Sequence, residues 1–180
     1  MLFASERIKF RKMNANDVSI YNRWRNDLEV MRTTSPSLDL YTEEESNDFV
    51  NHVILGSAAS KSYIILDKQD GDRPIGITSL IQLDYKNRNA ECIIDIGEKD
   101  CWGKGYGSEA LRLLLDYAFL ELNLHRVSLR VFSFNHRAIH LYEKIGFKHE
   151  GISRQAIFRD GGWNDIIQMA ILQHEYRAAM

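Results

Sequence analysis

Three alternate glycines in the second half of the chain form a loop that could hold an anion. Residues Trp102 to Ser108 read Trp-Gly-Lys-Gly-Tyr-Gly-Ser and stand between an expected strand and an expected helix. Glycines let backbone N–H groups converge without obstruction by Cβ atoms, and the start of the following helix adds unpaired N–H donors and its dipole. A pyrophosphate fits such a loop well. The alternative is a plain tight turn, which glycine often marks.

Two other phosphate-binding motifs do not fit this loop. The dinucleotide pattern Gly-x-Gly-x-x-Gly, begun at Gly103, needs a third glycine where the chain has Ser108, and it belongs early in a βαβ unit. The Walker A pattern Gly-x-x-x-x-Gly-Lys-Ser/Thr does not occur in the sequence. A nicotinamide-dependent oxidoreductase is therefore only a minor alternative.

A second segment, Asn135 to Phe147, carries a tyrosine that could supply a proton. The apolar face of the expected helix consists of Ala138, Leu141, Tyr142 and Ile145. Taken alone, Tyr142 is a core residue on this face, and Asn135 is a helix cap. A tyrosine hydroxyl has an ordinary pKa of about 10 and stays protonated at neutral pH, so Tyr142 can also donate a proton.

The elements that must position these segments follow from the hydrophobic pattern. Strands are expected at residues 8–12, 62–67, 75–85, 90–97, 127–132, 147–152 and 166–172. Helices are expected from Asn14 or Asn16 through Leu28, from Thr42 through Ile54, after the glycine loop through Leu122, and from Asn135 to Gly146. Loops are expected at 33–40 and 154–164. The order βααβββαβαββ predicts one mixed α/β (α+β) domain over residues 1–180.

The composition is ordinary for a globular protein. Of the 180 residues, 44% are hydrophobic and 27% charged, and the net charge of −2 offers no broad attraction to nucleic acid or anionic membranes. The two cysteines, Cys92 and Cys101, predict a reducing environment rather than a disulfide scaffold. No signal peptide or membrane span is recognisable, so a cytoplasmic location is expected.

Both segments resemble motifs of the GNAT acetyltransferases. The family's pyrophosphate loop reads Gln/Arg-x-x-Gly-x-Gly/Ala, which Gly105 and Gly107 match and from which Trp102 departs. The family's Asn-x-x-Ala-x-x-Leu-Tyr-x-x-x-Gly-Phe resembles residues 135–147 at every fixed position. Residues 151–163 and 169–176 are similar to the branch that holds ribosomal-protein N-terminal and spermidine acetyltransferases. The resemblance implies a mixed, mostly antiparallel central sheet flanked by helices, the GNAT-like acyl-CoA N-acyltransferase fold.

The resemblance also implies a chemistry, in which an amine attacks the thioester of acetyl-CoA as cosubstrate. Tyr142 is then the general acid for the leaving thiolate. Glu91 is the expected base, with a water chain as the alternative. The residues expected at the cofactor are Ile94, Asp95, Ile96, Trp102, Gly103, Lys104, Gly105, Tyr106, Gly107, Ser108, Asn135, Arg137, Ala138 and Lys144. Within residues 94–96, a backbone N–H would stabilise the oxyanion and the strand would pair with pantetheine amides.

Other roles for these residues stay open. A non-catalytic acetyl-CoA sensor or partner module is the alternative function, although the presence of Tyr142 and Glu91 favours an enzyme. A covalent route through either cysteine lacks a placed histidine partner. The pair His136 and His140 has helical spacing for a metal, but no third ligand is suggested, so no metal is expected.

The sequence leaves the acceptor open among small-molecule and peptide amines: a protein N-terminal amine, a polyamine or another small amine. Residues 24–55 and 154–164 are expected to recognise it. The acidic run at 43–48 could attract a polycation or could only be a solvated helix start. Ser79 and Gln82 stand where spermidine acetyltransferases carry acids, which counts against polyamines. No nucleic-acid or membrane partner is expected, and homo-oligomer formation stays open.

Overall fold

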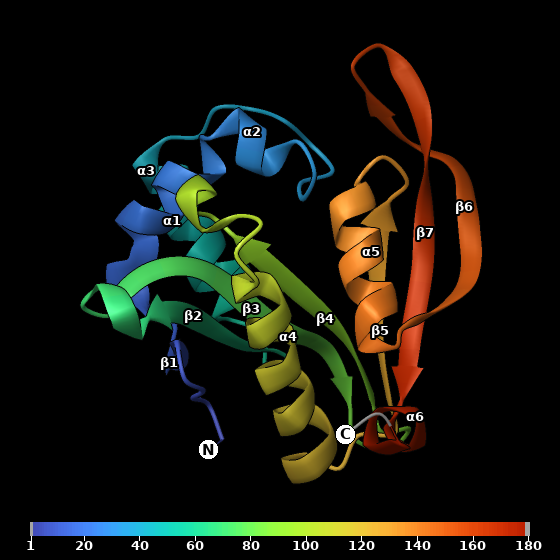
Figure 1. Ribbon diagram of the computed structural model, residues 1–180. Coiled ribbons are helices and arrows are strands. Elements are labelled where there is room, and N and C mark those ends of the chain that lie inside the picture. Colours follow the sequence, from blue (N-terminus) through green and yellow to red (C-terminus); the bar gives the residue numbers. More distant parts are fainter. Residues whose placement is uncertain (1, 179–180) are drawn as a thin grey trace.

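A seven-stranded sheet forms the centre of the computed structural model, which describes residues 2–178. The strands lie in the order β1-β2-β3-β4-β5-β7-β6 (Figure 1). Their bounds are β1 Ile8–Lys12, β2 Lys61–Asp67, β3 Arg73–Asp84, β4 Asn89–Ile96, β5 Arg126–Phe132, β6 Lys148–Arg159 and β7 Gly162–Leu172. All neighbours are antiparallel except β4 and β5. The expected fold class is thereby confirmed.

Helices cover both faces of this sheet. They are α1 Val18–Arg25, α2 Leu28–Met31, α3 Glu43–Phe49, α4 Tyr106–Asp116, α5 His136–Ile145 and α6 Gln173–Ala178. Adjacent β2 residues point to opposite faces, so that Ile64 packs with Trp24 of α1 while Ile65 packs in the larger core with α4. No helix within the described residues is long and apolar enough to cross a membrane.

The first helix ends earlier than the sequence pattern predicts. A continuous helix through Leu28 was expected, but α1 ends at Arg25 and the short α2 begins at Leu28. Asp27 causes the break, since its side chain accepts hydrogen bonds from the backbone N–H groups of Glu29 and Val30 and so caps a new helix. By contrast, the capping box of Thr42 and Glu45 at the start of α3 is present as predicted.

The expectation of a loop at residues 154–164 is wrong. This segment is a hairpin in which β6 and β7 continue to a two-residue turn at Asp160 and Gly161. Both turn residues have positive φ, 50° and 78°, as a type I′ hairpin turn requires. The hairpin extends beyond the rest of the sheet (Figure 1).

The parallel pair β4–β5 separates along its length. Only residues 89–91 of β4 pair with residues 126–128 of β5. Beyond this point β4 stays paired with β3 as far as Ile96, and β5 stays paired with β7 as far as Phe132. The sheet therefore opens between two halves that remain hydrogen-bonded elsewhere, and the divergence is visible in Figure 1.

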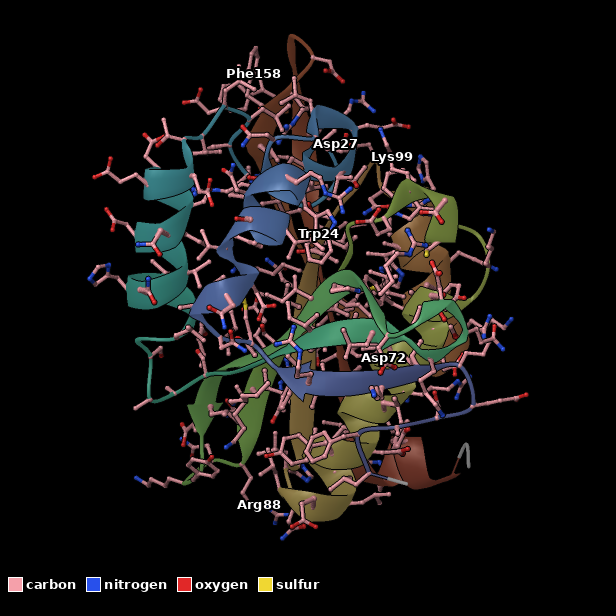
Figure 2. The ribbon with its side chains drawn as sticks, turned by 90° about the vertical axis from the view of Figure 1, so that its left-hand side faces the viewer. Trp24, Asp27, Asp72, Arg88, Lys99 and Phe158 are labelled. Carbon is pink, nitrogen blue, oxygen red and sulfur yellow. The ribbon has the colours of Figure 1, made fainter. Side chains whose placement is uncertain are left out.

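Side chains of α1 and α2 fix these helices to the end of β4. The indole N–H of Trp24 donates to Glu98 Oε1 over 2.8 Å, and Gly97 lies so close to this ring that a Cβ there would be 2.4 Å from it. Lys99 then pairs with Asp27 and Glu29, each over 2.9 Å (Figure 2). The helices on this face are thus held next to the opening of the sheet.

Candidate active site

The opening between β4 and β5 leads into a cavity of about 540 Å³. Its walls are β4 from Glu91 to Ile96, β5 from Arg130 to Phe132 with Ile166 of β7, residues 101–103 and 105–108, one face of α5 from Asn135 to Lys144, and Val30, Thr33, Thr34 and Pro36 from α2 and the loop after it. Every residue predicted for catalysis or for cofactor binding lines this cavity except Lys104. The sequence therefore identified residues that are far apart along the chain and share one site.

Backbone groups of β4 face this cavity. Gly97 N–H donates to Ile75 O over 2.9 Å, so the odd-numbered residues of β4 bond to β3. The alternation of an antiparallel pair then directs the N–H and C=O groups of Cys92, Ile94 and Ile96 toward the gap. Trp102 already occupies the carbonyl of Ile96 through its indole N–H, over 2.8 Å. An extended ligand with amide groups can therefore form hydrogen bonds with the strand edge around Ile94.

The start of α4 is open to an anion. Gly105, its N-cap residue, has φ of 86°, and no side chain caps the helix. The helices α3 and α5, by comparison, are capped by Thr42 and Asn135. The first N–H groups of α4 consequently lack partners, beside a loop whose glycines leave them accessible. These donors fit the pyrophosphate that the sequence motif predicts.

Arg7, which no sequence motif indicates, holds the glycine loop in place. Arg7 donates from Nη1 to Lys104 O over 2.9 Å and pairs with Glu109 of α4 over 2.6 Å. Its guanidinium also lies 4.7 Å from the ring centroid of Tyr106. Arg7 is about a hundred residues from its partners, which is why no local pattern reveals it.

Of the three cations expected near phosphates, two line the cavity. Arg137 lies over the ring of Trp102, with its Cζ 4.3 Å from the ring centroid, and Lys144 lines the wall formed by α5. Trp102, which departs from the family motif, thus supports a cation beside the loop. The side chain of Lys104 is exposed, and only its carbonyl is engaged, by Arg7.

Tyr142 reaches the cavity from α5. Asn135 caps this helix by accepting from the N–H of Ala138 over 3.2 Å, and Gly146 ends it with φ of 113°. The Tyr142 side chain is only 9% exposed, and no described residue hydrogen-bonds its hydroxyl. Burial raises the pKa of Tyr142 well above its ordinary value, and the neighbouring Cys92 and Asp95 raise it further. The hydroxyl therefore keeps its proton at neutral pH.

Two carboxylates of β4 line the cavity, and their surroundings differ. Glu91 forms an ion pair with Arg130 of β5 over 3.0 Å. Asp95 has no hydrogen-bond or ion-pair partner among residues 2–178, and burial raises its pKa to about 6. Asp95 was expected to act only through its backbone, because a strand pattern does not show which carboxylate lacks a partner.

The raised pKa of Asp95 predicts a pH-dependent gain in stability for Asp95→Asn. The charged carboxylate costs stability wherever it is ionised in the folded state, so the cost is complete above pH 6 and disappears below the unfolded value of 3.8. At about 1.36 kcal/mol per pKa unit, asparagine should raise the free energy of unfolding by up to about 3 kcal/mol at pH 8. Urea unfolding at pH 8 and pH 4 measures this, and an equal gain at both values would contradict it.

Comparison with known proteins agrees with this geometry. The chain matches the acetyltransferase (GNAT) domain family over residues 7–148. It is 30% identical over 174 residues to the uncharacterised N-acetyltransferase p20 of Bacillus licheniformis, which covers 96% of each chain. It is also 30% identical over 171 residues to the spermidine N(1)-acetyltransferase of Escherichia coli K12, covering 95% of this chain and 89% of that protein.

A solved structure extends the agreement to the fold. The spermidine N-acetyltransferase of Vibrio cholerae, in complex with CoA and spermine, matches with a TM-score of 0.86 and 29% identity over 96% of this chain and 99% of its own. The open strand edge, the uncapped α4 and the glycine loop are the features that fit CoA. The chain therefore belongs to the GNAT acetyltransferase family and is an acetyl-CoA-dependent N-acetyltransferase.

Proposed function

We propose that this chain acetylates a primary alkyl amine by direct attack on acetyl-CoA, with polyamines as the acceptor class and Tyr142 as the general acid. The observation that carries the proposal is the buried Tyr142, which lines the same cavity as an uncapped helix and an open strand edge. The polyamine class is supported by the spermidine acetyltransferases among the relatives.

Neither Ser79 nor Gln82, the two positions where acids are missing, lines the cavity. Ser79 is buried and donates from its hydroxyl to Ser62 Oγ over 2.8 Å, within the β2–β3 pair. It does not line the cavity. A carboxylate at either position would therefore not line this cavity.

The residues of the cavity have different roles in the acetyl transfer. Bound acetyl-CoA supplies the acetyl thioester. The N–H groups of Tyr106, Gly107 and Ser108 bind its phosphates, and the N–H of Ile94 stabilises the oxyanion. The Tyr142 hydroxyl gives its proton to the leaving sulfur and is restored by the proton that the new amide nitrogen loses. Glu91 is a candidate for the base, but its carboxylate is already engaged by Arg130.

A cofactor and acceptor screen tests the proposal. Acetyl-CoA at about 100 times its Kd should stabilise the fold by about 2.7 kcal/mol, which corresponds to a Tm increase of about 5–10 °C, whereas NAD and ATP should have no effect. Thiol release should then depend on the amine and be fastest with spermidine or spermine in a panel that includes peptides with free N-termini. Stabilisation by acetyl-CoA without thiol release for any amine would instead identify a sensor.

A further inference from the structure

The side chain of Asp95 lies on the face of the sheet that α1 covers. Asp95 stands directly opposite Ile77 of β3, and opposed residues of an antiparallel pair point to the same face. Ile77 packs with Trp24 in the smaller core beneath α1. The adjacent residues Ile94 and Ile96 pack against the larger core with α4, on the other face. Asp95 therefore lines the cavity from the side that α1 and α2 cover.

We propose that the carboxylate of Asp95 receives the ammonium group of the acceptor and removes the proton that the amine must lose before it attacks. This role rests on the proposed acetyl transfer. In this step an N–H bond of the ammonium breaks, its electron pair stays on nitrogen, and an O–H bond forms on the carboxylate. The net reaction releases one proton, and Asp95 returns to its charged form by passing that proton to solvent.

The lack of a partner distinguishes Asp95 from Glu91. Asp95 is a half-buried carboxylate that lines the cavity without a hydrogen bond or ion pair, so an arriving ammonium gains a charge-assisted interaction there. Glu91 would bind an ammonium group more weakly, because its carboxylate already forms an ion pair with Arg130. The two carboxylates are also four residues apart on β4, which is about 13 Å along a strand. Both cannot therefore contact one reacting amine.

The position of Asp95 relative to the general acid supports the same assignment. Burial raises the pKa of Tyr21 in α1 to about 12, and the charge of Asp95 contributes, as it does for Tyr142 in α5. Asp95 thus lies close enough to both Tyr21 and Tyr142 to raise the pKa of each. Arg25 of α1 acts on Tyr21 in the opposite direction, and β3 places the non-ionisable Ile77 next to Asp95. A base with a pKa of about 6 is well matched to catalysis near neutral pH.

The test compares the same chemical change at the two carboxylates. Asp95→Asn should lower kcat/KM for spermidine by about 10²–10⁴, the usual effect of losing a general base. The wild type should show an acid limb in kcat/KM near pH 6, and Asp95→Asn should lose it while Glu91→Gln retains it. Asp95→Glu keeps the carboxylate and should recover the acid limb.

Binding provides a readout that does not depend on turnover. Spermidine titrated calorimetrically into the protein without acetyl-CoA at pH 8 should bind more weakly to Asp95→Asn than to the wild type. Thermal unfolding verifies that each variant is folded. An unchanged acid limb and unchanged spermidine affinity in Asp95→Asn would overturn the proposal, as would loss of the limb in Glu91→Gln alone. A wild type that acetylates no amine would refute the proposed function, and the calorimetric comparison would still decide whether Asp95 binds the ammonium.

Discussion

Tyr142→Phe is expected to lower kcat by about 10²–10⁴, the span typical of losing a general acid. Phenylalanine keeps the ring that packs against Phe147, with ring centroids 5.8 Å apart, and removes only the hydroxyl. That hydroxyl has no hydrogen-bond partner among the described residues, so neither the stability nor the affinity for acetyl-CoA should fall. Single-turnover kinetics are the appropriate measurement, because a slow product release could otherwise hide the effect.

Tyr176→Phe is the matched control for this prediction. Tyr176 is also buried, but its hydroxyl donates to Asp116 Oδ1 over 2.8 Å, away from the cavity. Its loss should lower the free energy of unfolding by about 1 kcal/mol and leave turnover intact. Comparing the two variants should therefore distinguish a loss of activity from a loss of stability. Full single-turnover activity in Tyr142→Phe would remove Tyr142 from the mechanism while leaving the fold and the family unchanged.

Local signals in the sequence predicted much of the fold. The capping box at Thr42 and Glu45, the cap at Asn135 and the stop at Gly146 each depend on residues within one or two turns, and all three are present in the structure. The glycine loop was located for the same reason. A helix boundary was missed where one signal overrode another, since Asp27 starts a new helix inside an otherwise continuous apolar pattern.

The hairpin of β6 and β7 was missed although its turn has a recognisable sequence. Asp160 and Gly161 form the Asp-Gly pair that favours a type I′ turn, but the strands beside them are irregular. Register shifts interrupt the pairing between Ser153 and Ile157, where Gln155 has a φ of 49°. These bulges break the strict alternation on which strand prediction depends.

The candidate site was predictable in its motifs and not in its long-range contacts. Residues of the two motifs predicted most of the cavity wall. The contact of Arg7 with Lys104 and the unpaired state of Asp95 depend on how distant elements pack. Sequence patterns report residue types and faces, whereas the pKa of a carboxylate depends on which partners the fold provides.

Gly105→Val is expected to abolish most of the affinity for CoA. Gly105 has φ of 86°, a conformation in which a β-branched residue is strained, and a Cβ there would lie 3.3 Å from Arg7 Nη2. The loop must shift to relieve this strain, and the N–H groups at the start of α4 then lose their alignment with the pyrophosphate. One hydrogen bond to a charged group contributes about 1.5–3 kcal/mol, so losing even one should raise Kd by about 10- to 100-fold.

Gly71→Val separates this effect from general strain. Gly71 has a similar left-handed φ of 60°, with no atom within 4 Å of a built Cβ, and it lies in the turn before β3, outside the cavity. Both variants should lose stability by about 1–2 kcal/mol from the backbone conformation alone. Only Gly105→Val should also lose CoA binding in isothermal titration at a temperature where both are folded. If the two variants bound CoA equally well, the backbone at Gly105 would have no part in holding the pyrophosphate.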